Sequence, residues 1–314
     1  MAKLSFQYVR QGEVEELCAF LERRFRYHTR EEWEGLVGKG FVKVNGRKVS
    51  PRHILETRHK IVYETPPFPE PEIDRRFEVL YEDAHLLAVS KSGNIPTSPS
   101  GKYWKNCLVH VVKGEMALPW LHAVHRLDRE TSGVNLLAKT KEAARTLGFA
   151  FQQGRVRKRY SAVLMGHLKV RQVYVSAPLR DATGGAIRIK QAVHPLGRES
   201  RTRFELKCIL PGASLVHAVP ITGRTHQVRA HASFLGHPVA GDKLYGASEA
   251  EFLEWVNRDE RKSDARHLLH SSELTFPHPE SGEAVTLRAS DKVLIELFLQ
   301  GMRSPSVRGY MAQD

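Results

Sequence analysis

Residues 125–138 read HRLDRETSGVNLLA, a charged segment that runs directly into an apolar one. The second half, Val134 to Ala138, is aliphatic and predicts a buried strand. The first half packs two arginines, two acidic residues, two hydroxyl groups and a glycine into nine residues, which indicates a polar loop at the edge of that strand. Taken alone, this loop is explained best as a structural turn, held by ion pairs of Asp128 and by hydrogen bonds of the two hydroxyls. A second segment of the same kind changes that balance.

The second segment, residues 221–231, reads ITGRTHQVRAH. Its pattern predicts a helix, and Arg224, Gln227 and His231 fall on one side of it. The amino end of this helix follows Gly223, and a helix amino end among basic residues is suited to receiving phosphate oxygens. The segment therefore indicates an anionic ligand.

Positive charge extends well beyond these two segments. Residues 155–160 read RVRKRY, four cations that lead to one aromatic ring, a combination that follows a nucleic-acid backbone and stacks a base. The chain of 314 residues carries 48 Lys and Arg against 35 Asp and Glu, a formal net charge of +13. This excess points to a polyanionic partner. An anionic membrane would satisfy the same charge, but no apolar run approaches the roughly 20 residues of a spanning helix, and no hydrophobic leader follows Met1. We therefore expect nucleic acid and no membrane.

The numbers and spacings of the cysteines and histidines limit which kinds of site are expected. Three widely separated cysteines exclude a disulfide framework and fit a reducing cytoplasm. His217, His226, His231 and His237 lie close in sequence, but their spacings match no usual metal-ligand pattern. We expect them to make hydrogen bonds or to face RNA, and we expect no metal. The chain also lacks a phosphate-binding G-x-x-x-x-G-K-[ST] motif and a G-x-G-x-x-G motif after a strand, so no nucleotide cofactor is expected.

Residues 1–66 have a pattern of their own. Apolar residues at helical spacing predict a helix from Glu13 to Phe25, and a second helix surrounds Trp33. The dipeptide Asn45-Gly46 predicts a tight hairpin, and Lys60 to Glu64 predicts a further strand. The order is thus helix, helix, hairpin, strand.

This segment resembles the small RNA-binding fold of the S-four type of ribosomal protein, whose helices precede a hairpin like VKVNG at residues 42–46. It holds 13 Lys and Arg against 9 Glu, and such a module binds phosphates. The resemblance implies a small α/β RNA-binding domain, with Arg23, Arg24 and Lys43 as RNA contacts. The alternative is any small helix–hairpin domain with a solvated charged face.

Residues 67–76 read PFPEPEIDRR, and their prolines hold the chain extended, so we interpret them as an interdomain linker. From residue 77 to residue 300, short strands alternate irregularly with helices, which predicts an α+β domain. Residues 301–314 lack periodicity and predict a flexible tail. The predicted strands, besides that at Val134, are Phe77–Asp83, His85–Ser90, Tyr160–Met165, Gln172–Ala177, Ala186–Lys190, Thr202–Ile209 and Ala213–Ile221; the predicted helices are Lys141–Gln153, Gln227–Phe234 and Asp291–Leu299.

Together these pieces resemble the pseudouridine synthases of the RluA/RluD type, which isomerise uridine to pseudouridine in structured RNA. The matching pieces are His125-Arg126-Leu127-Asp128 with Thr131-Ser132-Gly133, Lys158-Arg159-Tyr160, Gly223 to Arg229, His231, Gly236-His237-Pro238, Gly241-Asp242, Leu269-His270 and Phe276 to Pro279. The chain departs from the family at Lys91-Ser92-Gly93, where Lys-Pro-x-Gly is usual. The resemblance implies a catalytic core with a mixed, mainly antiparallel sheet flanked by helices and loops.

The resemblance also implies three catalytic residues. The reaction breaks the bond between ribose C1′ and uracil N1 and rejoins the base through C5, so it needs an ionised carboxylate, a cation that keeps it ionised and a ring that retains the detached base. By resemblance these are Asp128, Arg229 and Tyr160, without cofactor or metal. Asp128 either attacks C1′ or promotes elimination to a glycal, and the sequence does not choose between the two routes. Tyr160 is expected to stack on uracil and is a candidate acceptor for a ribose proton.

A uridine in a structured RNA must leave its stack before C1′ is reachable. By resemblance, Arg126 is the residue that enters the vacated space, and Val228 lines the base pocket, with plain core packing as the alternative for Val228. The remaining expected contacts are Arg224, His226 and Gln227 for the substrate, and Arg157, Lys158 and Arg159 for the surrounding RNA.

Two rival functions fit part of the pattern. A non-catalytic RNA-binding or ribosome-assembly protein on the same fold would carry the same charge, but it would not require Asp128, Tyr160 and Arg229 together. A histidine-rich ribonuclease would use two histidines as acid and base and would shorten the RNA, whereas isomerisation leaves its length unchanged. We expect a monomeric, cytoplasmic isomerase that acts on structured RNA, with ribosomal RNA favoured over transfer RNA because of the additional amino-terminal module.

Deletion of residues 1–66 is predicted to weaken or redirect RNA binding without destroying the active site, because the site residues all lie in the other domain. Filter binding measures the first effect, and turnover of a minimal stem–loop that carries the target uridine measures the second. Complete loss of turnover on that stem–loop would show that the division into two domains is wrong.

Overall fold

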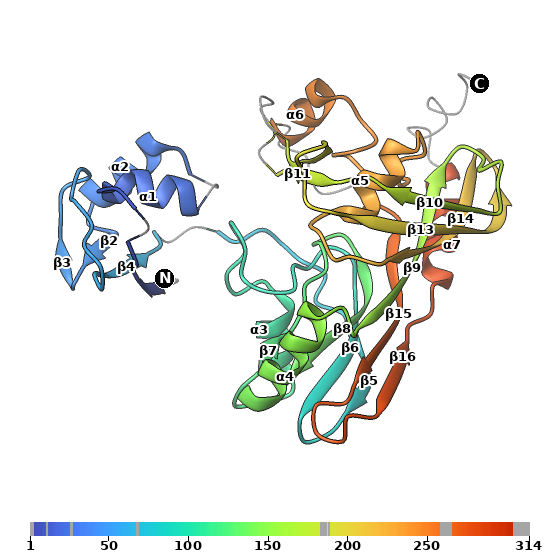
Figure 1. Ribbon diagram of the computed structural model, residues 1–314, viewed down its shortest axis with the longest axis horizontal. Coiled ribbons are helices and arrows are strands. Elements are labelled where there is room, and N and C mark those ends of the chain that lie inside the picture. Colours follow the sequence, from blue (N-terminus) through green and yellow to red (C-terminus); the bar gives the residue numbers. More distant parts are fainter. Residues whose placement is uncertain are drawn as a thin grey trace. The chain divides into compact units, whose positions relative to one another are not determined.

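The computed structural model describes residues 3–10, 12–25, 28–66, 69–182, 187, 189–257 and 266–303. The chain divides into two compact units, Met1–Pro71 and Glu72–Asp314 (Figure 1). The boundary falls within residues 67–76, the predicted linker, of which Pro67 and Phe68 lie outside the described residues.

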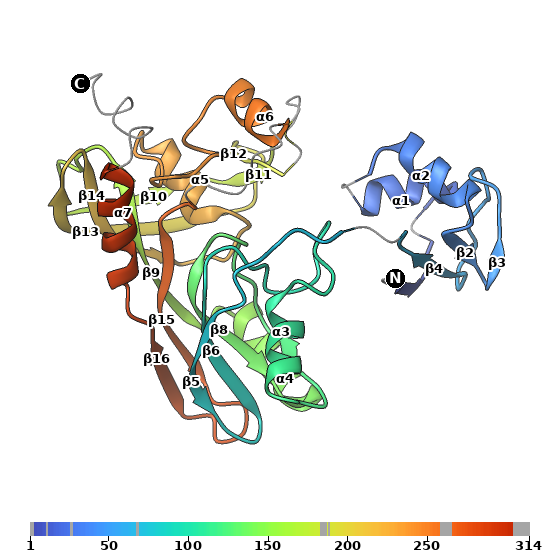
Figure 2. The same cartoon turned by 180° about the vertical axis from the view of Figure 1, so that it is seen from behind.

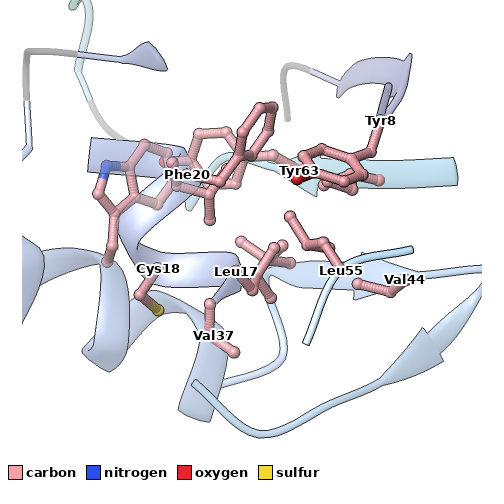
Figure 3. Close-up of a cluster of buried hydrophobic side chains, with 12 residues drawn as sticks. Tyr8, Leu17, Cys18, Phe20, Val37, Val44, Leu55 and Tyr63 are labelled. Carbon is pink, nitrogen blue, oxygen red and sulfur yellow. The ribbon is translucent and has the colours of Figure 1, made fainter. Parts of the chain in front are cut away.

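The first unit consists of two helices on a four-stranded antiparallel sheet. The strands are β1 (Lys3–Gln7), β2 (Val42–Val44), β3 (Arg47–Lys48) and β4 (Lys60–Glu64), in the order β1-β4-β2-β3, and the helices are α1 (Leu17–Arg24) and α2 (Arg30–Gly38). Figure 3 shows its core, in which Leu17 and Phe20 of α1 gather with Val37 of α2 and Tyr63 of β4. Asn45 and Gly46 take positive φ angles of 50° and 78°, as the predicted two-residue hairpin turn requires.

Two features of this unit differ from the sequence prediction. The first helix begins at Leu17 and not at Glu13, because the backbone before it pairs with a later loop through Leu17 N to His53 O at 2.8 Å. Val14 is accordingly 59% exposed. Strand β1 was not predicted; it pairs with β4 along its whole length.

The second unit is built on one large sheet. Its order is β10-β13-β14-β9-β15-β8-β6-β5, with β7 added to β8 and β16 to β15, and every pairing is antiparallel except that of β15 with β8 (Figures 1 and 2). The strands of this sheet are β5 (Phe77–Glu82), β6 (Leu86–Lys91), β7 (His122–Ala123), β8 (Ser132–Ala138), β9 (Arg157–Met165), β10 (Gln172–Ser176), β13 (Arg201–Leu210), β14 (Ala213–Pro220), β15 (Leu269–Pro277) and β16 (Ala284–Arg288). The predicted α+β class with a mixed, mainly antiparallel sheet is confirmed.

The helices and a small ribbon complete this unit. They are α3 (Leu108–Glu115), α4 (Lys141–Gln152), α5 (Gln227–Phe234), α6 (Glu249–Asn257) and α7 (Lys292–Arg303), with the ribbon β11 (Leu179–Asp181) and β12 (Gln191–Val193). Helices α3 and α6 were not predicted. Among the described helices none is both long and apolar enough to cross a membrane; the longest, α4 and α7, have 12 residues.

Two predicted boundaries need correction. Residues 187, 189 and 190 of the predicted strand Ala186–Lys190 form no strand, and the other two residues lie outside the described part. Helix α7 continues to Arg303, so the predicted flexible tail does not begin at residue 301. Residues 304–314 lie outside the described residues.

Helices cover both faces of the sheet, which explains its apolar strands. Alternate residues of β6 point to opposite faces: Leu86 packs with Leu147 of α4, and Leu87 packs with Leu108 of α3. Strand β9 is enclosed in the same way, by α5 on one face and by α7, visible in Figure 2, on the other. Because successive side chains of a strand point to opposite faces, every second residue of β9 faces α5 and the residues between them face α7.

The close approach of β8 and β15 depends on Gly133. This residue has a φ of +102°, and a Cβ there would lie 2.3 Å from the carbonyl oxygen of Ser271. We predict that Gly133→Ala lowers the free energy of unfolding by about 2–4 kcal/mol, because the left-handed backbone and the overlap are both unfavourable. Urea denaturation measures this.

Gly148→Ala is the matched control, since Gly148 lies within α4 and an added Cβ would meet no atom within 4 Å. That change is expected to stabilise by about 0.5–1 kcal/mol. Equal effects of the two substitutions would contradict the steric argument.

Candidate active site

A pocket of about 350 Å³ opens where three segments of the second unit meet. These are the loop 125–131 before β8, the first residues of β9, and the segment 222–229 that leads into α5. Phe151, Pro220 and Leu269 complete its wall. The fold therefore brings together both dense polar segments and the basic strand of the sequence.

The loop 125–131 is fixed from several sides. The N–H of Thr131 donates to the carbonyl oxygen of Asp128 at 3.1 Å, which forms a tight turn directly after Asp128. The N–H of Leu127 donates to Thr97 Oγ1 at 3.1 Å. Thr131 Oγ1 lies 2.8 Å from His267 Nε2, so the hydroxyl is used within the protein. The position of Asp128 is consequently set by the scaffold and not by its local arginines.

Lys91, at the end of β6, is buried under this loop. Its Nζ donates to the carbonyl oxygens of Ser92, Ile95 and Arg129 at 3.0, 2.7 and 3.0 Å. The last of these bonds holds the residue that follows Asp128.

Ser92 stands where the related motif has proline, and it makes two bonds that proline could not make. Its N–H donates to the carbonyl oxygen of Arg76 at 3.2 Å, and its hydroxyl donates to that of Asp74 at 2.7 Å. Ser92 thus ties residues 74–76 to the end of β6 within the second unit, while Lys91 keeps its three hydrogen bonds.

Asp128 and Arg229, 101 residues apart, meet in the pocket. Arg229 Nη1 donates to Asp128 Oδ2 at 2.8 Å. The guanidinium side chain is only 8% exposed, whereas the Asp128 side chain is 29% exposed. The carboxylate therefore faces the pocket and the cation lies behind it.

A second carboxylate holds the other side of Arg229. Its Nε and Nη2 donate to Asp242 at 2.6 and 2.8 Å, and Asp242 Oδ1 also accepts the N–H groups of Leu244 and Tyr245. The Tyr245 ring lies 5.1 Å from the guanidinium carbon. Because Asp242 takes two donors, Arg229 binds one oxygen of Asp128 only. Asp128 Oδ1 makes no hydrogen bond within the described part of the chain and is available to a substrate.

The environment keeps Asp128 ionised. Burial of its carboxyl raises the pKa, but the nearby His226 and Arg229 outweigh this, so the pKa of Asp128 lies below its ordinary value. Burial lowers the pKa of His226, whose Nε2 is 3.9 Å from Asp128 Oδ1, whereas a guanidinium stays protonated in proteins. Arg229 is therefore the permanent cation, and Asp128 has the charge that a nucleophile needs.

Tyr160 and Lys158 reach the pocket because they share one face of β9. Burial, and then the charge of Asp128, raise the pKa of Tyr160, so its phenol is neutral. A neutral ring suits stacking, and the phenol oxygen could accept a proton only after losing its own. Arg157 and Arg159 point to the opposite face, where Arg159 Nη1 lies 3.3 Å from Glu273 Oε2. These two predicted RNA contacts do not line the pocket.

The segment before α5 has a strained backbone at His226, which has a left-handed φ of 54°. Its Nδ1 is 3.2 Å from the Tyr245 hydroxyl. Arg224 lines the pocket, although its Nε donates to the carbonyl oxygen of Glu199 at 3.0 Å. Val228 packs in the core and also lines the pocket, so its core packing leaves the predicted contact with the base possible.

Gln227 was predicted to bind substrate, but its amide is occupied within the protein. Its oxygen accepts from Thr222 Oγ1 and from the N–H of Arg224, and its nitrogen donates to the carbonyl oxygen of Arg201 and to Thr202 Oγ1. Through these four bonds it positions the segment 222–226, while it also lines the pocket.

His231 was expected on the same helix side as Arg224, yet it is fully buried. Its ring nitrogens lie 2.8 Å from Thr202 Oγ1 and 2.9 Å from the carbonyl oxygen of Ala177, away from the pocket. Within the described ranges, no group of three or more His, Cys, Asp or Glu could hold a metal ion.

Arg126 lies exposed at the rim of the pocket and makes no hydrogen bond to any described residue. The remaining predicted contacts, Arg23, Arg24 and Lys43, belong to the first unit. Sequence reasoning missed Asp242 and Tyr245, which orient Arg229. The available signal was the acid in Gly241-Asp242, which belongs to the quoted motif but was given no role.

The chain is similar to known RNA-modifying enzymes. A model of the family described as RNA pseudouridylate synthase matches residues 85–234. The uncharacterized RNA pseudouridine synthase YjbO of Bacillus subtilis is 32% identical over 80% of this chain and 87% of its own. The ribosomal large subunit pseudouridine synthase C of Vibrio vulnificus is 33% identical over 86% and 87% of the two chains. The solved structure of human RNA Pseudouridylate Synthase Domain Containing 1 aligns with a TM-score of 0.58 and 27% identity, over 73% and 89% of the chains.

Replacement of Asp242 by Asn is predicted to lower the free energy of unfolding by about 3–5 kcal/mol, because buried Arg229 loses one of its two anions. The same change should lower the pKa of Asp128 further, since Asp242 no longer competes for the guanidinium. Urea denaturation and NMR titration of labelled aspartate measure the two effects.

Asp74→Asn is the control, because Asp74 pairs with Arg76, whose side chain is 88% exposed. Its cost should stay below about 1 kcal/mol. An unchanged Asp128 pKa in the Asp242 variant would refute the competition for Arg229.

Proposed function

The chain belongs to the RNA pseudouridine synthase family and is thus an isomerase that converts uridine to pseudouridine in RNA; from this premise we propose that Asp128 is its catalytic carboxylate and that ribosomal RNA is its substrate. The observation that carries the first part is the bond of 2.8 Å between Arg229 and Asp128 in a pocket that Tyr160 lines. It gives an ionised carboxylate with one oxygen open to a substrate.

Each side chain of the pocket has a role in this proposal. Asp128 Oδ1 acts on ribose C1′, while Arg229 holds the other oxygen and keeps the carboxylate ionised. Tyr160 stacks on the uracil, which must stay in the site while it is detached and turned. Val228 and Leu269 offer the base an apolar wall. The same arrangement serves direct attack and elimination to a glycal.

A pocket of about 350 Å³ is at the small end of the range for ligand sites, about 300–1,000 Å³. It accommodates one nucleotide and not a duplex, so the target uridine must turn out of its stack to reach Asp128. Arg126, exposed at the rim and without a hydrogen bond to any described residue, is the side chain available to fill the space that the uridine leaves.

Two observations favour ribosomal RNA. Similar proteins carry the name ribosomal large subunit pseudouridine synthase C, and the similarity covers most of both chains. The net charge of +13 suits an extended RNA surface. We further propose that the first unit is an RNA-binding module and that the enzyme works as a cytoplasmic monomer, since one chain supplies all residues of the pocket.

The pocket does not favour a ribonuclease. Of its two histidines, His125 has a pKa lowered to about 3, mainly by burial, and its Nε2 accepts the N–H of Leu136 at 3.0 Å. It cannot act as an acid near neutral pH, so the acid–base pair of histidines is missing from the described pocket wall.

Asp128→Asn is predicted to leave RNA affinity nearly unchanged and to lower conversion by about 10³-fold or more, because the amide keeps the shape but lacks nucleophilicity. Carbodiimide-blocked primer extension on ribosomal RNA measures conversion, and filter binding measures affinity. Turnover near that of the wild type would end the proposed role of Asp128, and modification confined to transfer RNA would end the proposed substrate.

A further inference from the structure

The first unit divides its charge unevenly along the sequence. The helical segment, residues 12–38, has 4 Lys and Arg against 7 Glu, whereas the sheet segment, residues 39–60, has 7 Lys and Arg against 1 Glu. The unit is therefore acidic over its helices and basic over its hairpin and the loop that follows it. If this unit binds RNA, as proposed above, the two halves cannot contribute equally.

Two arginines of the helical half, Arg23 and Arg30, are already paired with carboxylates within the protein. Arg23 donates two hydrogen bonds to Glu15, at 2.9 and 3.0 Å. Arg30 pairs with Glu16 at 2.7 Å and with Glu34 at 3.2 Å. These carboxylates neutralise Arg23, one of the predicted RNA contacts, and also Arg30.

The other two predicted contacts also have internal partners. The guanidinium carbon of Arg24 lies 5.0 Å from the ring centre of Phe6 and 5.5 Å from that of Phe25. Lys43 Nζ is 3.3 Å from Glu64 Oε2. An RNA phosphate would have to compete with these contacts.

Strand pairing gathers a different set of cations at one end of the small sheet. Lys60 begins β4, where it pairs with Gln7 of β1, and its N–H donates to Asn45 Oδ1 of the hairpin turn at 2.8 Å. Arg47 follows that turn directly. Lys60 and Arg47 therefore flank the turn.

Two more arginines lie at the same end of the small sheet, next to the last residues of β1. The N–H of Arg58 donates to the carbonyl oxygen of Tyr8 at 2.9 Å, just beyond β1. The N–H of Arg10 lies 3.4 Å from Thr57 Oγ1. The strand order places these four cations, Arg10, Arg47, Arg58 and Lys60, along an edge of about 14 Å, three strand spacings of about 4.8 Å. We call them the turn-end cluster.

The turn-end cluster is exposed and unneutralised. All four side chains are exposed, and none forms an ion pair with a described carboxylate. Arg10 donates to the carbonyl oxygen of Gly12 only, and Glu56, the acid of this segment, lies 3.7 Å from His59 Nε2. We propose that the turn-end cluster, and not the arginines of α1, is the surface through which the first unit binds the phosphate backbone of RNA.

The surroundings specify the kind of contact. The nearby aromatic ring of Tyr8 is only 2% exposed, and Val44 before the turn is 3% exposed. Among the described residues at this end, the remaining ring, that of His59, is 16% exposed and already stacks on the ring of His53, so the exposed groups are mainly cations. The contact is with phosphates, independent of base sequence and strongly dependent on salt.

The test compares two triple variants of the full chain that remove equal charge. The first is Arg47→Gln, Arg58→Gln and Lys60→Gln; the second is Arg23→Gln, Arg24→Gln and Lys43→Gln. The readout is the slope of log Kd against log salt concentration for a large-subunit ribosomal RNA fragment. Each lost phosphate contact reduces the slope by about 0.7–0.9, so the first variant should lose about 2 and the second less than half of that.

An equal or larger loss in the second variant would overturn the proposal, and so would an unchanged slope in the first. Circular dichroism of both variants shows whether the first unit keeps its fold, and Arg10→Gln alone, with an expected loss of about 0.7–0.9, repeats the test with one charge. Turnover of the wild-type enzyme on the same RNA tests the proposed function separately. If no pseudouridine forms in that RNA, the proposed substrate is wrong, but the salt dependence of Kd still shows which surface of the first unit binds RNA.

Discussion

The structure of the catalytic unit depends on one guanidinium that two carboxylates share. Arg229 is almost fully buried, and burial of a cation is costly unless anions compensate it. Asp242 supplies most of that compensation through two short hydrogen bonds, and Asp128 supplies the rest through one. The loop before β8 must therefore meet the start of α5 and the turn after it, although Asp128 lies 101 residues before Arg229. The shape of the pocket follows from that meeting.

The same arrangement explains how a carboxylate can be both held and reactive. A guanidinium that faced Asp128 with two donors would occupy both of its oxygens. Because Asp242 takes Nε and Nη2, only Nη1 remains for Asp128. The unfavourable effect of burial on the Asp128 charge is outweighed without closing the side of the carboxylate that faces the pocket. Phe151, Val228 and Leu269 provide the apolar wall beside Tyr160.

Much of the site was predictable because its residues lie in dense local motifs. Asp128, Tyr160 and Arg229 line one pocket, and α5 has the bounds predicted from its pattern. The errors come from interactions that sequence spacing does not reveal. Pairing with a distant loop delays α1 until Leu17, which makes the predicted start at Glu13 wrong. The same kind of interaction places Arg157 and Arg159 on the face of β9 away from the pocket and engages the amide of Gln227, while the predicted RNA and substrate contacts of these residues stay predictions. The role of Asp242 was not predicted, because nothing in the sequence distinguishes an aspartate that orients an arginine from any other aspartate.

Arg126 is an exposed pocket residue whose side chain makes no hydrogen bond to any described residue. A long cationic side chain loses rotamer entropy worth up to about 2 kcal/mol when it is fixed, and in the role proposed for Arg126 that loss occurs only when RNA binds. Selectivity among uridines can arise from the local rigidity of the RNA, which sets the cost of unstacking, without any side chain that reads the neighbouring bases.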